Sequence, residues 1–213
     1  MTAISTLAEE QPARGSFFPP QRNRVIVPES IETIHTPRLI LRPLALSDAE
    51  DIFEHRRLQE VADWLILKVP HKDVQETRDS IAAKVFTTPD ASGATGRIFS
   101  FAIMLADDAT EKVIGALGVN ALSPAPSIGY CTHPGSWGQG IGSEAVKGLV
   151  DAWWRLPRVE VAVEGKEKLF AGCSTANVAS LKVLFKNGFQ VYEETKIMGE
   201  DVALFELETP KGE

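Results

Sequence analysis

The chain has 213 residues, with 22 basic and 29 acidic side chains and a net charge of −7. This length suits one domain, or one domain with an appendage, and buries a core without disulfides or a structural metal. The acidic balance argues against nucleic acid or anionic membranes as partners. We find no apolar run of membrane-spanning length and no secretory signal pattern. With only two cysteines, a soluble protein of the reducing cytoplasm is expected.

Residues 1–33 differ from the rest of the chain, because prolines interrupt them and they lack a sustained apolar period. Such a segment buries too little apolar surface to offset its ordering entropy. We therefore expect an N-terminal extension that is poorly ordered or straps onto the body, followed by a domain over residues 34–213. A basic targeting peptide is a second interpretation, against which Glu9 and Glu10 argue.

From Thr36 onward, strand and helix signals alternate. Ser47, with Glu50 three residues later, predicts a helix start with a capping box. Further helices are expected over 73–85, 143–154 and 179–186, the last closed by Asn187 and Gly188. Strands are expected over 38–42, 97–105, 113–119, 128–132, 159–163, 169–174, 189–194 and 202–207. The order predicts an antiparallel hairpin early in the chain and βαβ-like connections later.

The most informative segment lies between the strand expected at 128–132 and the helix expected from 143. Gly138, Gly140 and Gly142 stand there at alternate positions. A backbone without side chains approaches a ligand closely, and the free N–H groups and dipole of a helix start favour an anion. The segment therefore predicts a phosphate-binding loop, with a plain glycine-rich turn as the alternative.

Two common phosphate-binding motifs fit this loop less well. The P-loop pattern is absent, since no Gly-Lys-Ser/Thr follows at the required spacing. Gly140, Gly142 and Ala145 do satisfy the dinucleotide fingerprint, with Glu160 about 20 residues further on. That fold places the fingerprint on its first strand, whereas a hairpin precedes it here. A nicotinamide oxidoreductase is therefore a less favoured interpretation.

The segment 137–142 resembles motif A of the GNAT (Gcn5-related) N-acetyltransferases, whose signature is Q/R-x-x-G-x-G/A, with Trp137 as a departure in the first slot. Three further pieces resemble the Rim-type, ribosomal-protein N-terminal acetyltransferase-like branch: 36–43, 128–130, and 177–180 leading to 186–189. The resemblance implies an α/β (α+β in some schemes) GNAT fold of three layers. Its central sheet would be mixed, mostly antiparallel and of six to seven strands, splayed between the fourth and fifth, with helices on both faces.

The resemblance also implies acetyl-CoA as cosubstrate, a primary amine as acceptor, direct transfer in a ternary complex and no metal. The residues that match the family's CoA-binding positions are Tyr130, Cys131, Thr132, Trp137, Gly138, Gln139, Gly140, Ile141, Gly142, Ser143 and Asn177. Asn177 also precedes a helix, so a capping role is a second interpretation.

The catalytic candidates are Ser180 and His133. Many relatives carry a tyrosine four residues before the Gly-Phe glycine as acid for the departing thiolate, but Leu184 occupies that slot here. Ser180, one turn earlier, is therefore the candidate acid or water-orienting group that the Rim-type pattern implies, with a helix-surface serine as the alternative. The glutamate that relatives often place before the glycine loop is also missing, and His133 is the nearby candidate base. Further candidates for the acceptor site are His55, Glu60 and Asp63.

A covalent acetyl-cysteine step at Cys131 or Cys173 is conceivable, but small buried side chains are the favoured interpretation. The acceptor follows from amine pKa values: a lysine amine near 10.4 needs a strong base at pH 7, whereas an α-amino group at about 7.7–8.0 does not. The missing glutamate thus favours a protein N-terminus. Alternatives are a polyamine, an amino acid, a xenobiotic amine, or a non-catalytic CoA-binding regulatory module. The chain is expected to be a monomer or homodimer.

Overall fold

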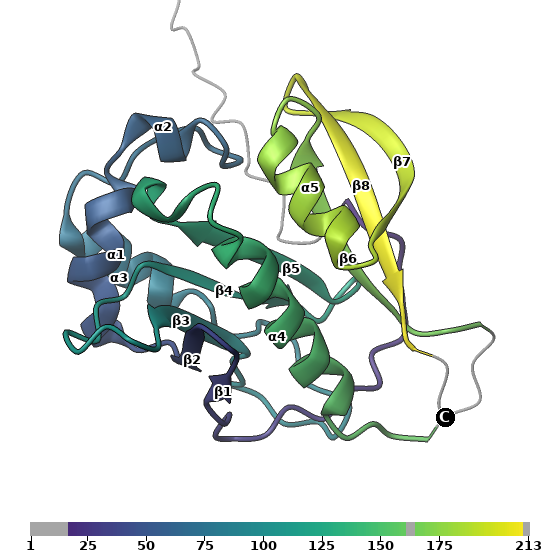
Figure 1. The fold of residues 1–213 in the computed structure, drawn as a ribbon. Coiled ribbons are helices and arrows are strands. Elements are labelled where there is room, and N and C mark those ends of the chain that lie inside the picture. Colours follow the sequence, from purple (N-terminus) through teal and green to yellow (C-terminus); the bar gives the residue numbers. More distant parts are fainter. Residues whose placement is uncertain (1–16, 161–164, 211–213) are drawn as a thin grey trace, which may run out of the picture.

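The computed structural model describes residues 17–160 and 165–210, and Figure 1 shows how its elements are arranged. Its strands are β1 (Ile34–His35), β2 (Leu39–Pro43), β3 (Ser100–Leu105), β4 (Gly115–Ala121), β5 (Ser127–Thr132), β6 (Lys168–Ser174), β7 (Gln190–Ile197) and β8 (Glu200–Glu208). Its α-helices are α1 (Ala49–Arg56), α2 (Gln59–Ala62), α3 (Val74–Ala82), α4 (Ile141–Arg155) and α5 (Val178–Lys186), and 3-10 helices cover Leu46–Asp48 and Pro134–Ser136. No helix within these described ranges has the length and apolar character that a membrane span requires.

The strands form one mixed sheet of eight, in the order β1-β2-β3-β4-β5-β6-β8-β7. Neighbours are antiparallel except for β5 and β6, which run parallel. The six to seven strands that the resemblance implies are too few, since the sheet has eight and includes the two-residue β1. Part of the strand expected over 159–163 lies outside the described residues; just before it, Arg158 forms an isolated bridge with Val25.

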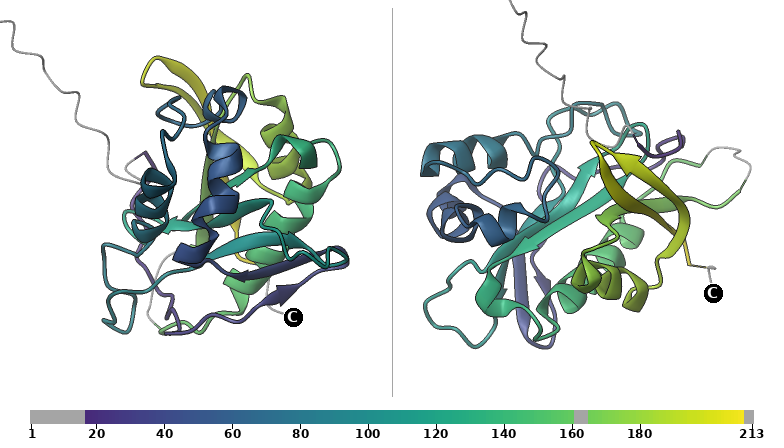
Figure 2. Two further views of the ribbon diagram at one scale, coloured as in Figure 1. Left: turned by 90° about the vertical axis from the view of Figure 1, so that its left-hand side faces the viewer. Right: turned by 90° about the horizontal axis from the view of Figure 1, so that it is seen from above.

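Helices cover both faces of the sheet, as the two views of Figure 2 show. The central strand β3 supplies side chains to both layers. Phe101 and Ile103 pack into the core that contains α4, whereas Ala102 and Met104 pack into the core that contains α1 and α3. Because successive side chains of a strand point to opposite faces, a strand buried on both faces has a continuous apolar sequence.

The first long helix begins later than the capping box predicts. Residues 46–48 form a 3-10 turn, and α1 starts at Ala49. The buried Asp48 carboxylate accepts a hydrogen bond from Ala45 N (2.9 Å) and pairs with the Arg42 guanidinium of β2 (2.6 Å). The capping box at Ser47 is therefore wrong, because a tertiary ion pair that local spacing does not reveal fixes Asp48 at this corner.

Residues 17–27, here called the strap, run along the body of the protein. Val25 and Val27 are fully buried, and Phe18 packs on Phe170 with the ring centroids 5.5 Å apart. The Gln21 side chain donates to Lys168 O (2.9 Å) and accepts from Lys168 N (2.8 Å). The strap is thus held by apolar burial and by hydrogen bonds to the start of β6.

Candidate functional site

The glycine loop connects β5 to α4 and adopts a conformation that few other residues tolerate. Gly138 and Gly140 have φ values of +73° and +80°, in the left-handed region. Gly140 is the N-cap of α4, and no side chain in the described structure caps this helix. The N–H groups of its first turn, from Ile141 to Ser143, therefore point out of the helix start and are available to an anion.

Side chains of the loop bind the loop itself. Trp137 Nε1 donates to Thr132 O (3.1 Å), and Gln139 Nε2 donates to Gly135 O (2.6 Å). His133 Nδ1 accepts from Gly135 N (3.0 Å). These bonds hold the backbone in place, so that main-chain groups rather than side chains face solvent at Gly138 and Gly140.

Glu144 joins the start of α4 to the β1–β2 turn. Its carboxylate accepts from Thr36 Oγ1 (2.6 Å) and Arg38 N (2.8 Å), and it pairs with the Arg38 guanidinium (2.7 Å). Partial burial alone raises the pKa of Glu144, but the hydrogen bonds from Thr36 and Arg38 outweigh it and lower the pKa. Arg38 also donates to Gln139 O (3.0 Å). Two segments that are 101 residues apart in the sequence, at Arg38 and Gln139, thus form one anchor for the glycine loop.

β5 and β6 diverge beside this loop. They are paired only at Ser127 and Phe170. Three residues beyond that pair stand Tyr130 on β5 and Cys173 on β6, and Ser180 of α5 lies between them. Its Oγ is 2.6 Å from the Tyr130 hydroxyl, and its hydroxyl also contacts the Cys173 thiol. The splay therefore falls between the two strands expected at 128–132 and 169–174, which are the fifth and sixth once β1 is counted.

Asn177 is the N-cap of α5, since its Oδ1 accepts a hydrogen bond from Ser180 N (3.0 Å). The capping interpretation is confirmed, and it fixes the first turn of α5 at the mouth of the gap between β5 and β6. Leu184, in the slot where relatives carry a tyrosine, is 1% exposed and belongs to the core.

The other face of β5 carries a different set of groups. Cys131 and His133 face α1 there, and the rings of His133 and His55 meet edge to face with centroids 6.2 Å apart. Burial raises the pKa of the Cys131 thiol, and the nearby Arg56 guanidinium offsets part of that rise. Arg56 is held in turn by His71 Nε2 (2.8 Å).

His55 is the most unusual member of this face. It is 1% exposed, and neither ring nitrogen has a hydrogen-bond partner among residues 17–160 and 165–210. Burial, and next the neighbouring His133 and Arg56, lower its pKa to about 4, so the ring is neutral at pH 7. The sequence signal for its burial is the helical spacing: His55 follows Ile52 by three residues, so both lie on the buried side of α1. Glu60 and Asp63, the other acceptor-site candidates, are exposed.

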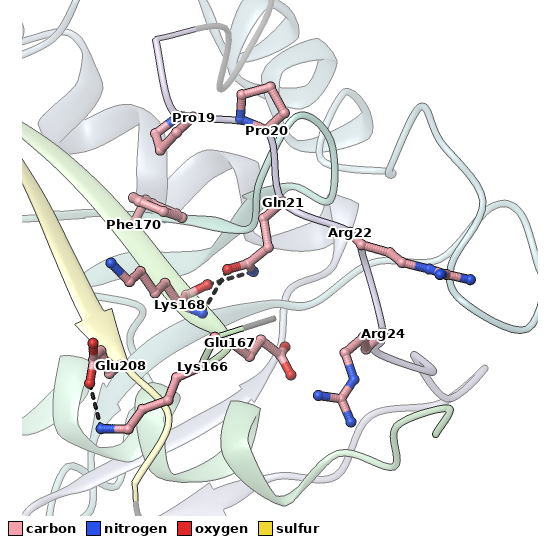
Figure 3. A pocket seen from close by; sticks show the side chains of 11 residues that line it. Pro19, Pro20, Gln21, Arg22, Arg24, Lys166, Glu167, Lys168, Phe170 and Glu208 are labelled. Carbon is pink, nitrogen blue, oxygen red and sulfur yellow. Dashed lines mark hydrogen bonds and ion pairs between the residues drawn. The ribbon is translucent and has the colours of Figure 1, made fainter. Parts of the chain in front are cut away.

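A pocket of about 590 Å³ lies apart from the glycine loop (Figure 3). It is bordered by the strap, by the start of β6 and by the end of β8. Its lining includes Gln21, Arg24, Lys168 and Glu208 but none of the predicted site residues. Within the described residues, no group of three or more histidine, cysteine or acidic side chains is arranged to hold a metal ion. Most of the predicted site residues therefore lie in the glycine loop and between β5 and β6, whereas Cys131 and His133 lie on the α1 face.

Comparison with known proteins identifies the same family by sequence and by structure. The family model described as acetyltransferase (GNAT) domain matches residues 38–190. The N-acetyltransferase p20 of Bacillus licheniformis is 31% identical over 189 residues, which are 83% of this chain and 96% of that protein.

Solved structures share the fold at lower identity. A GNAT-family acetyltransferase from Bacillus anthracis superposes with a TM-score of 0.64 at 17% identity, covering 84% of this chain and 99% of that one. RimL, described as a ribosomal L7/L12 alpha-N-protein acetyltransferase in complex with coenzyme A, superposes with a TM-score of 0.62 at 19% identity, covering 83% and 98%.

Proposed function

Because this chain belongs to the GNAT acetyltransferase family, we propose that it acetylates the α-amino group of a peptide or protein N-terminus at the gap between β5 and β6. The chain is an acyl-CoA-dependent N-acetyltransferase. The observation that carries the proposal is the divergence of β5 from β6 after a single pair, directly beside an uncapped helix start.

The donor fits this site through backbone groups. Beyond Ser127, the edge of β5 that faces β6 has no strand partner, so the main-chain N–H and C=O of Tyr130 and the N–H of Thr132 are available to the pantetheine amides, whereas the Cys131 main chain faces Ala116 of β4. The pyrophosphate would lie on the N–H groups around Gly138 to Ser143, where the helix dipole favours negative charge. The side chains of Trp137 and Gln139 hold this backbone in place through their hydrogen bonds to Thr132 O and Gly135 O.

The transfer step needs an oxyanion site and two proton movements. The amine nitrogen attacks the acetyl carbonyl carbon, and a free N–H on the β5 edge stabilises the oxyanion. The C–S bond then breaks with its electron pair on sulfur, the nitrogen loses one proton and the sulfur gains one. Ser180, which lies in the gap, is the candidate hydrogen-bond donor to the sulfur, whose proton arrives through solvent, and His133, on the α1 face, is the candidate acceptor for the amine proton.

The nature of the acceptor follows from the weak bases on the α1 face. His55 stays neutral with a pKa of about 4 and is a poor proton acceptor, and the Glu54 carboxylate, which interacts electrostatically with His133, is ion-paired with Lys112 (2.7 Å). An α-amine with a pKa of about 7.7–8.0 is partly neutral at pH 7 and needs little help, unlike a lysine amine. The fold likeness to RimL supports the same acceptor class. A small-molecule amine is the second candidate.

The test is release of CoA thiol from acetyl-CoA in the presence of an acceptor panel. A peptide with a free N-terminus is expected to support turnover, whereas the same peptide with a blocked N-terminus and an internal lysine is not. Turnover with polyamines or free amino acids alone would assign a small-molecule acceptor. Measurable CoA binding without thiol release from any acceptor would identify a non-catalytic CoA-binding module.

A further inference from the structure

The Tyr130 hydroxyl is engaged with α5 rather than with solvent. Its oxygen lies 2.6 Å from Ser180 Oγ, where either hydroxyl can donate, and 3.3 Å from the alternative acceptor Ser180 O. The rest of the ring packs against the core beneath α4. Tyr130 and Ser180 are 50 residues apart in the sequence, so only the tertiary fold brings the two hydroxyls together.

Ser180 alone would be a poor hydrogen-bond donor to a ligand. A serine in a helix readily donates its hydroxyl proton to a backbone carbonyl of the preceding turn. The proton is then not available for a hydrogen bond to a ligand. Tyr130 competes with that arrangement when its single O–H proton is donated to Ser180 Oγ, the shorter of its two contacts, because the serine proton then points away from Tyr130, toward the side of Cys173. Leu184 is in the core, so that residue supplies no hydroxyl in its place.

We propose that Tyr130 is a positioning residue that turns the Ser180 O–H toward the sulfur of CoA in the gap between β5 and β6. This inference rests on the proposed function of that gap. When the C–S bond breaks, the electron pair stays on sulfur, and the Ser180 O–H stabilises it by a hydrogen bond. The proton lost by the amine then reaches sulfur through solvent, so that the products are the amide and the CoA thiol.

Both hydroxyls act in this scheme as neutral donors. Burial raises the pKa of Tyr130, and its hydrogen bond with Ser180 offsets only part of that rise. The titratable group that faces the pair is the Cys173 thiol on β6, whose pKa is also raised by burial. Neither hydroxyl therefore ionises near neutral pH, and the pair stabilises the thiolate without itself carrying charge.

The first test compares Tyr130→Phe, Ser180→Ala and the double variant. Each single variant is expected to lower kcat about tenfold, the size of one lost hydrogen bond to a charged group, with the KM for acetyl-CoA unchanged. The double variant should lose no more than either single one, because the two residues act as one unit. Tyr192→Phe is the matched control, since that buried hydroxyl has no partner in the described part of the chain. Its kcat should equal that of the wild type.

The second test does not depend on the acceptor. The thiol pKa of CoA bound to the protein is followed by thiolate absorbance during a pH titration. It is expected to rise by about one unit in Tyr130→Phe and in Ser180→Ala, and to stay unchanged in Tyr192→Phe. A wild-type thiol pKa and a wild-type kcat in Tyr130→Phe would overturn the inference. The thiol pKa shift without turnover of any amine would support it and remove the proposed acceptor.

Discussion

The two faces of β5 differ in how their polar groups are satisfied. On the α5 face, the hydroxyls of Tyr130 and Ser180 bond to each other, and Asn177 caps the helix that carries the serine. On the α1 face, a buried His55 has no partner in the described structure and lies against His133. The α5 face is thus fixed by hydrogen bonds between neutral groups, whereas the α1 face holds a buried imidazole, His55, whose pKa is lowered to about 4 by burial. Dependence on pH should therefore come from the α1 face.

The largest effect is expected at the glycine loop, which follows β5 directly in the chain and leads into α4. Gly140→Glu places a carboxylate at a left-handed residue beside the predicted pyrophosphate position. Repulsion between like charges should weaken CoA binding by roughly 100-fold or more, measured by isothermal titration calorimetry. Gly93→Glu is the control, because Gly93 is also left-handed (φ +87°) with open space around it. Equal affinity in both variants would mean that CoA binds elsewhere.

An effect of comparable size is expected from His55 on the acid side. The folded protein keeps the ring neutral down to about pH 4, whereas the unfolded chain protonates it near pH 6.5. The unfolded state therefore binds more protons in this window, and the free energy of unfolding should fall by about 3 kcal/mol as the pH drops from 6.5 to 4. His55→Leu should flatten this slope in denaturant unfolding.

His35, which is exposed on β1, provides the control for that experiment. His35→Leu should leave the dependence of unfolding free energy on pH as it is in the wild type. If His55→Leu also retained the full slope, the acid sensitivity would have another source, and the contrast between the two faces of β5 would lose its main support.

A smaller effect is expected at the anchor of the glycine loop. Glu144→Gln weakens the bonds to Thr36 and Arg38, and since Arg38 is half exposed, about 1 kcal/mol of stability should be lost. CoA affinity should fall by less than tenfold, because the loop glycines remain. Thermal unfolding and calorimetry measure the two effects. Asp151→Asn, which removes an exposed ion pair on the same helix, should change stability by less than about 0.5 kcal/mol.

Local signals in the sequence predicted much of this architecture. The alternating glycines identified the loop before α4, and Asn177 was recognised as a residue that caps a helix. These features depend on neighbours within a few residues, where turn and cap chemistry are decisive. The mixed sheet and its splay followed from the family resemblance rather than from periodicity.

The features that sequence alone missed depend on distant contacts. Asp48 is fixed by Arg42 and displaced the predicted cap at Ser47. Tyr130 reaches Ser180 across 50 residues, and Arg56 approaches Cys131 from another layer. Such pairings depend on register and packing, and no local pattern encodes them. β1 was missed because two residues are too few to show alternation.

The most direct measurement of the central claim is amide hydrogen exchange with and without acetyl-CoA. If the donor lies along the free edge of β5 and on the start of α4, protection should increase in residues 128–132 and 138–143 and remain unchanged at the strap pocket, around residues 166–170. Protection confined to 166–170, with no change at the glycine loop, would contradict the account.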